Sequence, residues 1–214
     1  MNKQSLRILL ADDHAVVRSG VRRLLEEQSQ VAEVGEACDG DEAFRLARAE
    51  PWNVLVLDIG MPGRDAMNVV HLLKSEQPEL AILILSMYPE DQYAVRALKA
   101  GASGYITKTS TLEEIIRAIL IVANGDIYLS SKSARMLADH LHAKPEQTAH
   151  ELLSDREFSV LRCIAEGKSL AQIAEDTHLS VKTISTYRGR LCLKLGVQNN
   201  VELARYAREH GLMG

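Results

Sequence analysis

The 214-residue chain has no long hydrophobic run, and this absence limits the classes of protein to which it can belong. Its longest apolar stretches, around residues 81–85 and 118–123, are far shorter than the roughly 20 residues that a transmembrane helix needs. Residues 1–7 also lack the long apolar core of a signal peptide. We therefore expect neither a membrane protein nor a secreted one.

Cysteine is also scarce. The three cysteines, Cys38, Cys163 and Cys192, are odd in number and widely spaced, so they indicate neither a disulfide framework nor a metal-binding pattern. The chain contains no low-complexity tract and no repeat with the period of a solenoid protein. These absences favour an ordinary globular protein of a reducing compartment, and we expect it in the cytoplasm.

Charge is unevenly distributed along the chain. Residues 1–130 contain 13 Lys and Arg against 19 Asp and Glu, a balance of −6. Residues 131–214 contain 12 against 10, a balance of +2. At this length, an acidic first part and a mildly basic second part indicate two domains with different partners.

Short apolar runs in the first part each end at a polar residue. The runs cover residues 8–10, 54–57, 82–85 and 104–107. The polar residues that follow them are, in order, Asp12 with Asp13, Asp58, Ser86 and Lys108. Because helical stretches separate the runs, they predict a parallel sheet whose strands all end at one edge. Open α/β sheets build their sites at that edge, so we expect a site for a divalent cation and a phosphoryl group.

The intervening segments have the periodicity and end signals of helices, and the strand–helix unit repeats five times from about residue 7 to residue 124. In the first helix, Val21 and Leu25 belong to one apolar face. Gly101 is placed to end the fourth helix. Thr111 and Glu114 have the spacing of a capping box at the start of the fifth.

A change of composition separates the two parts. Residues 126–150 combine serines, histidines and Pro145 in short polar pieces, and we interpret them as a linker with a helical stretch over residues 133–141. The predicted organisation is a first domain over residues 1–125, this linker, and a second domain over residues 151–214.

The second domain is predicted to consist of four helices. Three of them begin at serines with N-cap spacing, namely Ser154, Ser169 and Ser180. A helix over residues 169–177, a turn at His178-Leu179 and a helix that Gly196 ends form a helix-turn-helix.

The second helix of this motif carries a one-sided charge. No acidic residue occurs between Asp176 and Glu202. The same stretch contains four cations, Lys182, Arg188, Arg190 and Lys194. Cations beside short polar side chains suit the phosphates and base edges of DNA. The alternative is a solvated basic face on a structural helix.

With these residues in place, the first domain resembles the receiver domain of bacterial two-component response regulators. The resemblance covers residues 5–125 and implies a flavodoxin-like (CheY-like) fold with a five-stranded parallel sheet. It also implies a Mg²⁺ site formed by the carboxylates of Asp12, Asp13 and Asp58 and the backbone carbonyl of Gly60. Asp13 would further help to order the site.

The same resemblance assigns roles to the remaining residues of the predicted edge. Asp58 would be the phosphoacceptor, which takes a phosphoryl group from a sensor histidine kinase. Lys108 would face the phosphate, Ser86 would move to bond it, and Tyr105 would turn inward as Ser86 shifts. The implied protein is a phosphoacceptor that can lose its own phosphoryl group, not an enzyme in the usual sense. Thr109 stands where many receivers have proline, which is unremarkable in the subfamily considered next.

The second domain resembles the LuxR-type helix-turn-helix, so the whole chain is similar to NarL/FixJ-subfamily response regulators. The motifs that carry this resemblance are Leu153 to Glu157, Gly167 to Ser169, Ile173-Ala174, Leu179 to Ile184, Arg190 and Lys194 to Val197. The implied base contacts are Ser185, Thr186 and Arg188. The implied backbone contacts are Lys182, Thr183, Tyr187, Arg190 and Lys194. A last helix over residues 200–210 would form a homodimer contact on promoter DNA, and RNA polymerase would be a further partner.

Two positions depart from the usual pattern of this helix. Gly189 lies where a longer residue is common, and Leu193 lies where a charged residue is usual. Rival functions fit less well. A haloacid dehalogenase-type phosphatase needs an Asp where Gly60 stands, and a dinucleotide-binding enzyme needs a glycine-rich turn where Asp12 and Asp13 stand. A phosphorylation-dependent adaptor that does not bind DNA is the remaining alternative.

Overall fold

Five parallel strands form one sheet in the first of two units of the chain. The computed structural model describes residues 5–142, 149–177 and 179–212, and the units are Met1–Lys144 and Pro145–Gly214. The strands are β1 (Leu6–Ala11), β2 (Val31–Ala37), β3 (Val54–Asp58), β4 (Ala81–Ser86) and β5 (Gly104–Thr107). Their order in the sheet is β2-β1-β3-β4-β5. This order confirms the predicted flavodoxin-like fold with a five-stranded parallel sheet.

The register of the strands brings their carboxyl ends together. Leu57 of β3 pairs with Ala11 at the end of β1, and Asp58, the last residue of β3, pairs with Leu85 in β4. Ser86 pairs with Thr107 at the end of β5. Every residue of β3 and β4 is buried, which explains their continuous apolar runs. The polar residues that end these strands therefore lie along one edge.

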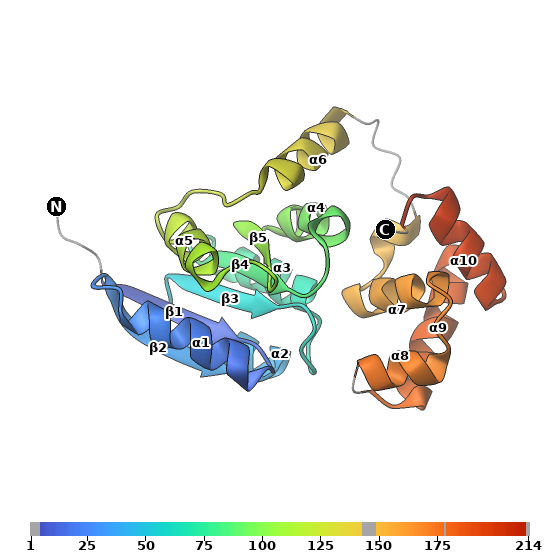
Figure 1. Ribbon diagram of the computed structural model, residues 1–214, viewed down its shortest axis with the longest axis horizontal. Helices are drawn as coiled ribbons and strands as arrows, with labels where there is room; N and C mark the ends of the chain where they lie inside the picture. Colours follow the sequence, from blue (N-terminus) through green and yellow to red (C-terminus); the bar gives the residue numbers. More distant parts are fainter. Residues whose placement is uncertain (1–4, 143–148, 178, 213–214) are drawn as a thin grey trace. The chain divides into compact units, whose positions relative to one another are not determined.

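Helices cover both faces of the sheet. They are α1 (Ala15–Glu26), α2 (Gly40–Ala49), α3 (Ala66–Glu76), α4 (Glu90–Ala100) and α5 (Leu112–Ala123). Helix α1 lies beside α5, whereas α3 packs between α2 and α4 (Figure 1). Val21 and Leu25 are fully buried in the core, as predicted. Gly101 ends α4 with φ 107°, but at α5 only the Thr111 half of the expected capping box forms.

The segment predicted as a linker is partly folded onto the first unit. Tyr128 forms a parallel bridge with Gly104 of β5, and α6 (Ser131–His142) packs against α4 (Figure 1). Ser133, the first residue of the predicted helical stretch, is polar and yet fully buried. Its hydroxyl is satisfied by Glu90, a partner 43 residues away that local sequence patterns do not reveal.

The second unit is a helical domain that begins with a short 3₁₀ helix, Ala149–Leu152. Its α-helices are α7 (Asp155–Ala165), α8 (Leu170–Asp176), α9 (Val181–Leu195) and α10 (Asn200–Glu209). Both capping boxes, at Ser154 and Ser169, are complete, Ser180 caps α9, and Gly196 ends it with φ 67°. Of the predicted turn, His178 lies outside the described residues. Within the described part of the chain, no helix is long and apolar enough to cross a bilayer.

Candidate functional site

Three carboxylates meet at the carboxyl edge of the sheet. Asp12 and Asp13 follow β1, and Asp58 ends β3. Together with His14 they offer ligand atoms that all lie within 4.8 Å of one another. The side chains of Asp12 and Asp58 are buried, whereas that of Asp13 is 31% exposed. The structure thus brings together the predicted acidic cluster and leaves it open to solvent on the Asp13 side.

Lys108 enters this cluster from the other side of the edge, directly after β5. Its ammonium lies 2.7 Å from Asp58 Oδ2 and 2.8 Å from Asp12 Oδ2, and its side chain is 2% exposed. A buried cation between two buried carboxylates offsets part of their mutual repulsion. The predicted meeting of Asp12, Asp58 and Lys108 is therefore present in the structure.

Burial dominates the electrostatics of Asp58. Desolvation raises the pKa of its carboxyl, and the Lys108 ammonium and the hydrogen bond from the Gly60 N–H (3.0 Å) oppose that rise. Asp12 Oδ2 is buried and makes no hydrogen bond of good geometry, although Lys108 lies nearby. A bound dication would favour the ionised form of Asp58 and could bind this Asp12 oxygen as well.

His14 is a member of the cluster that sequence reasoning missed. Its Nδ1 lies 2.7 Å from Asp13 Oδ1 and 3.4 Å from Lys108 Nζ. Its backbone N–H donates to Asp12 Oδ1 at 2.8 Å, which fixes the loop after β1. The only signal in the sequence is that His14 directly follows the paired acids.

Ser86 ends β4, Tyr105 lies in β5, and both are fully buried. Ser86 Oγ accepts a hydrogen bond from the Tyr88 N–H at 3.1 Å. The Tyr105 hydroxyl donates to the Tyr88 carbonyl at 2.8 Å. The ring of Tyr105 thus occupies the inward position here, and Tyr88 connects it to the serine.

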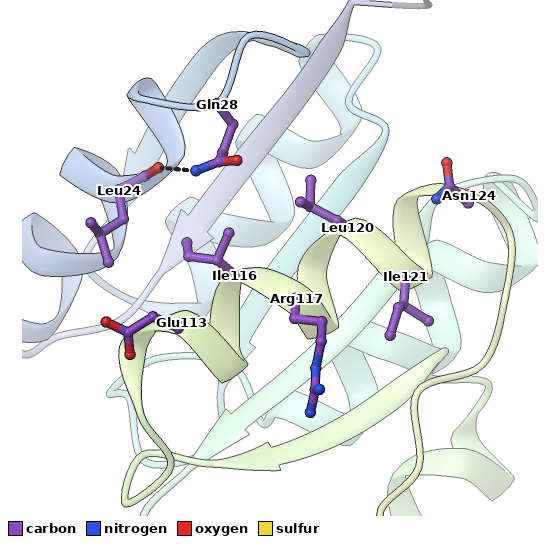
Figure 2. Close-up of a pocket in the computed structure, with 8 residues that line it drawn as sticks. All are labelled: Leu24, Gln28, Glu113, Ile116, Arg117, Leu120, Ile121 and Asn124. Atoms are coloured by element: carbon purple, nitrogen blue, oxygen red, sulfur yellow. Dashed lines mark hydrogen bonds between the residues drawn. The ribbon is translucent and has the colours of Figure 1, made fainter.

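A separate cavity of about 390 Å³ lies between α1 and α5 (Figure 2). Leu24, Ile116 and Leu120 give it an apolar lining, and Gln28 donates a hydrogen bond to the Leu24 carbonyl at its rim. None of the predicted phosphoryl-site residues lines this cavity. The chemistry of the acidic cluster therefore does not involve it.

In the second unit, α9 presents a polar face to solvent. The exposed residues of this face include Lys182, Ser185, Thr186 and Arg190, which recur at helical spacing. Among the described residues, neither Lys182 nor Arg190 has an ion-pair partner. Gly189 and Leu193 share the face, and Leu193 is 84% exposed.

The other predicted DNA contacts are engaged within the domain. Arg188 Nε donates to Asn200 Oδ1 at 2.7 Å, and Lys194 Nζ lies 2.6 Å from Glu157 Oε2. The remaining two are half-buried: Tyr187 accepts from Arg156, and Thr183 contacts the N-cap Ser180. Charge alone could not separate these residues from the exposed ones, because a cation can pair inside the protein.

Both parts of the chain match known protein families. A family described as the response regulator receiver domain matches residues 8–120, and one described as bacterial regulatory proteins of the luxR family matches residues 151–207. The chain is a two-component response regulator of the NarL/FixJ subfamily. Its two units are a receiver domain and a LuxR-type DNA-binding domain.

Similar response regulators align over nearly the whole chain. The response regulator UvrY of Escherichia coli (strain K12) is 32% identical over 208 residues, which cover 97% of this chain and 95% of UvrY. RcsB of Salmonella enterica serovar Typhimurium, solved on the promoter rprA with the phosphomimetic BeF₃⁻, is 28% identical with a TM-score of 0.59. That match covers 94% of this chain and 98% of RcsB. A structure of two RcsB dimers on two parallel DNAs gives the same identity and TM-score over 95% and 98% of the two chains.

Proposed function

We propose that a sensor histidine kinase phosphorylates Asp58 of this response regulator in the bacterial cytoplasm, and that the modification switches dimerisation and promoter binding. The observation that carries the proposal is the position of Asp58. Its carboxylate is buried at the edge of the sheet, 2.7 Å from Lys108 and beside two further acids. An anion held against a fixed cation in this way is placed to receive a phosphoryl group.

In the proposed step, a carboxylate oxygen of Asp58 attacks the phosphorus of the phosphohistidine. The new O–P bond makes an acyl phosphate, the N–P bond breaks, and the histidine of the kinase leaves as an imidazole. Lys108 faces the added phosphoryl oxygens. Subsequent hydrolysis of the acyl phosphate would return Asp58 to its carboxylate and end the signal.

The donor set of the cluster fits Mg²⁺, because all the acidic ligands are hard oxygens and Asp12 Oδ2 lacks a hydrogen bond. Asp12, Asp13 and Asp58 would hold the ion with the backbone carbonyl of Gly60, and Asp13 would help to order the site. When bound, Mg²⁺ neutralises negative charge on the transferring group.

Ser86 is the hydroxyl proposed to move towards the phosphoryl group, which requires it to give up the Tyr88 N–H. Tyr105 is the proposed aromatic switch residue; its ring already lies inward in this structure, and its hydrogen bond to the Tyr88 carbonyl ties it to the same loop. The contacts of Tyr88 with both residues support a single coupled movement of the loop that follows β4.

For DNA, we assign direct contact to the exposed face of α9, with Ser185 and Thr186 at base edges and Lys182 and Arg190 at phosphates. The engaged residues, Thr183, Tyr187, Arg188 and Lys194, would first position the helix. By exchanging partners, Arg188 could reach the bases and the other three the DNA backbone. Two such domains in a homodimer would place two recognition helices on half-sites about one helical turn apart. RNA polymerase would be contacted at the promoter. We retain 1–125, 126–150 and 151–214 as the functional division of the chain.

The test is selection from a pool of genomic duplex fragments at fixed salt, with and without acetyl phosphate and Mg²⁺. Enrichment that strengthens with the phosphoryl donor, and loses this response in Asp58→Ala, is the expected result. Enrichment that is the same with and without the phosphoryl donor would contradict control of DNA binding by phosphorylation. An absence of selective binding in both states would instead favour an adaptor.

A further inference from the structure

Helix α6 is held to the receiver domain by a polar contact at its first turn. Ser130 precedes α6, and its hydroxyl accepts from the Ser133 N–H at 3.1 Å, which caps the helix. Ser133 is fully buried although it is polar. The first turn of α6 therefore depends on whatever satisfies these two serines.

That partner is one carboxylate. Glu90 Oε2 accepts a hydrogen bond from Ser133 Oγ at 2.8 Å and another from Ser130 Oγ. Hydrogen bonds to an ionised acceptor are stronger than those between neutral groups, and a buried hydroxyl that loses its acceptor is costly. Glu90 thus fastens α6 to α4, and the two helices pack side by side (Figure 1).

Glu90 also lies at the end of the loop that connects β4 to α4. It is the first residue of α4, Pro89 precedes it as the N-cap, and Ser86 lies only four positions upstream. Between them, Tyr88 bonds Ser86 and Tyr105 through its backbone and stacks its ring on Tyr93 of α4, with centroids 4.8 Å apart. A displacement of Ser86 must therefore alter the Tyr88 backbone and reach the first turn of α4.

We propose that Glu90 is the positioning residue that couples the phosphoryl site to α6, the last described helix before the DNA-binding domain in the chain. When Ser86 exchanges the Tyr88 N–H for a phosphoryl oxygen on Asp58, the start of α4 shifts and Glu90 loosens its hold on Ser130 and Ser133. The first turn of α6 then opens more readily. This inference rests on the proposed phosphorylation of Asp58.

Coupling between two sites is reciprocal, so the contact can be probed from either end. If the phosphoryl group weakens the attachment of α6, then loss of the attachment makes the phosphorylated arrangement easier to reach. Glu90→Ala should accordingly strengthen the binding of BeF₃⁻ with Mg²⁺, even though Glu90 does not belong to the acidic cluster.

The experiment uses the full chain and measures hydrogen–deuterium exchange of peptides covering residues 131–138, with and without BeF₃⁻ and Mg²⁺. In the wild type, BeF₃⁻ should speed exchange there about fivefold or more, a typical size for coupling between sites. Glu90→Ala should show fast exchange without BeF₃⁻, little further response, and an apparent BeF₃⁻ affinity raised by a similar factor. Ser133→Ala, which removes one of the two hydroxyl donors with little change of volume, should shift both readouts in the same direction by less.

Glu113→Ala is the matched control, because Glu113 is an exposed first-turn glutamate of α5. It should leave both readouts at wild-type values. If BeF₃⁻ protects the loops around Asp58 but neither α6 exchange nor the affinity of Glu90→Ala changes, the coupling is wrong and the phosphoacceptor assignment stands. If BeF₃⁻ with Mg²⁺ changes exchange nowhere in the wild type, the proposed phosphoacceptor itself is wrong.

Discussion

Lys194 Nζ lies 2.6 Å from Glu157 Oε2, and the side chain of that glutamate is 3% exposed. The same carboxylate oxygen accepts the Ser154 N–H at 2.9 Å in the capping box of α7. A cation on the recognition helix thus neutralises a buried acid at the start of another helix. This places Lys194 in the structure of the domain before any role on DNA.

We therefore predict that Lys194→Ala lowers stability more than it lowers DNA affinity. Removing the ammonium leaves the buried Glu157 carboxylate without its cation, so the free energy of unfolding should fall by about 1–2 kcal/mol. The loss is limited to this size because Lys194 is itself partly exposed. Calorimetry of the full chain should show a lower unfolding temperature for the second unit. An unchanged transition with a large loss of affinity would contradict this role.

Lys182→Ala should have the opposite profile. Lys182 is exposed on α9 and has no ion-pair partner among the described residues, so unfolding should be little affected. Loss of one phosphate contact should weaken binding to all duplexes and reduce the slope of log affinity against log salt by about 0.9. Titrations at several salt concentrations measure this slope. A slope equal to that of the wild type would remove Lys182 from the interface.

Gly189→Ala should stabilise the second unit. Gly189 lies in the middle of α9, and an added Cβ would meet no atom within 4 Å among the described residues. Alanine is favoured over glycine by about 1 kcal/mol at such a position. Thermal unfolding checks this, with Gly20→Ala in α1 as a second mid-helix glycine whose Cβ meets only an ordinary contact with Leu112. A lower unfolding temperature in Gly189→Ala would show that the glycine has an internal role.

Asp58→Asn should stabilise the receiver domain in the absence of Mg²⁺ while abolishing phosphorylation. The substitution removes one buried negative charge from a cluster of three acids, and Lys108 keeps Asp12 as its partner. We expect a gain on the order of 1 kcal/mol. Mg²⁺ should raise the unfolding temperature of the wild type but have a much smaller effect on the variant. Equal effects of Mg²⁺ on both proteins would place the ion elsewhere.

The thiols of Cys38 and Cys163 should differ in reactivity. Burial raises the pKa of Cys163, so its thiolate is scarcer at neutral pH than that of an ordinary cysteine. The rate at which Cys163 is alkylated should therefore increase as the pH rises towards that pKa. Cys38 is exposed. At neutral pH, peptide mass spectrometry after brief alkylation should find Cys38 modified at least about tenfold faster than Cys163. Faster labelling of Cys163 than of Cys38 would contradict the partial burial of Cys163.

The sequence was sufficient to predict the sheet and the acidic cluster, because strand ends in a parallel sheet must meet at one edge. Asp12, Asp58 and Lys108 could be placed together from their positions after apolar runs. The serine N-caps of the second domain could also be predicted, because capping depends on residues that are three positions apart in the sequence.

What could not be predicted depends on contacts between distant residues. Nothing near Ser133 in the sequence points to Glu90, so the attachment of α6 to α4 could not be predicted from the sequence. Likewise, Arg188 and Arg190 look alike in the sequence, but one is bonded to Asn200 and the other is exposed. Helical periodicity assigns each residue to a face of the helix, but it does not predict which cations form hydrogen bonds or ion pairs within the domain.

The bridge between Tyr128 and Gly104 has a consequence for solubility. β5 is the last strand of the sheet, and an uncovered strand edge offers unpaired backbone groups to other chains. The chain returns after α5 to occupy part of that edge, with the Tyr128 N–H donating to the Ser103 carbonyl at 2.9 Å. A Cβ at position 104 would come within 2.7 Å of the Tyr128 carbonyl oxygen. A side chain there would push this cover away, and aggregation through an opened strand edge would follow.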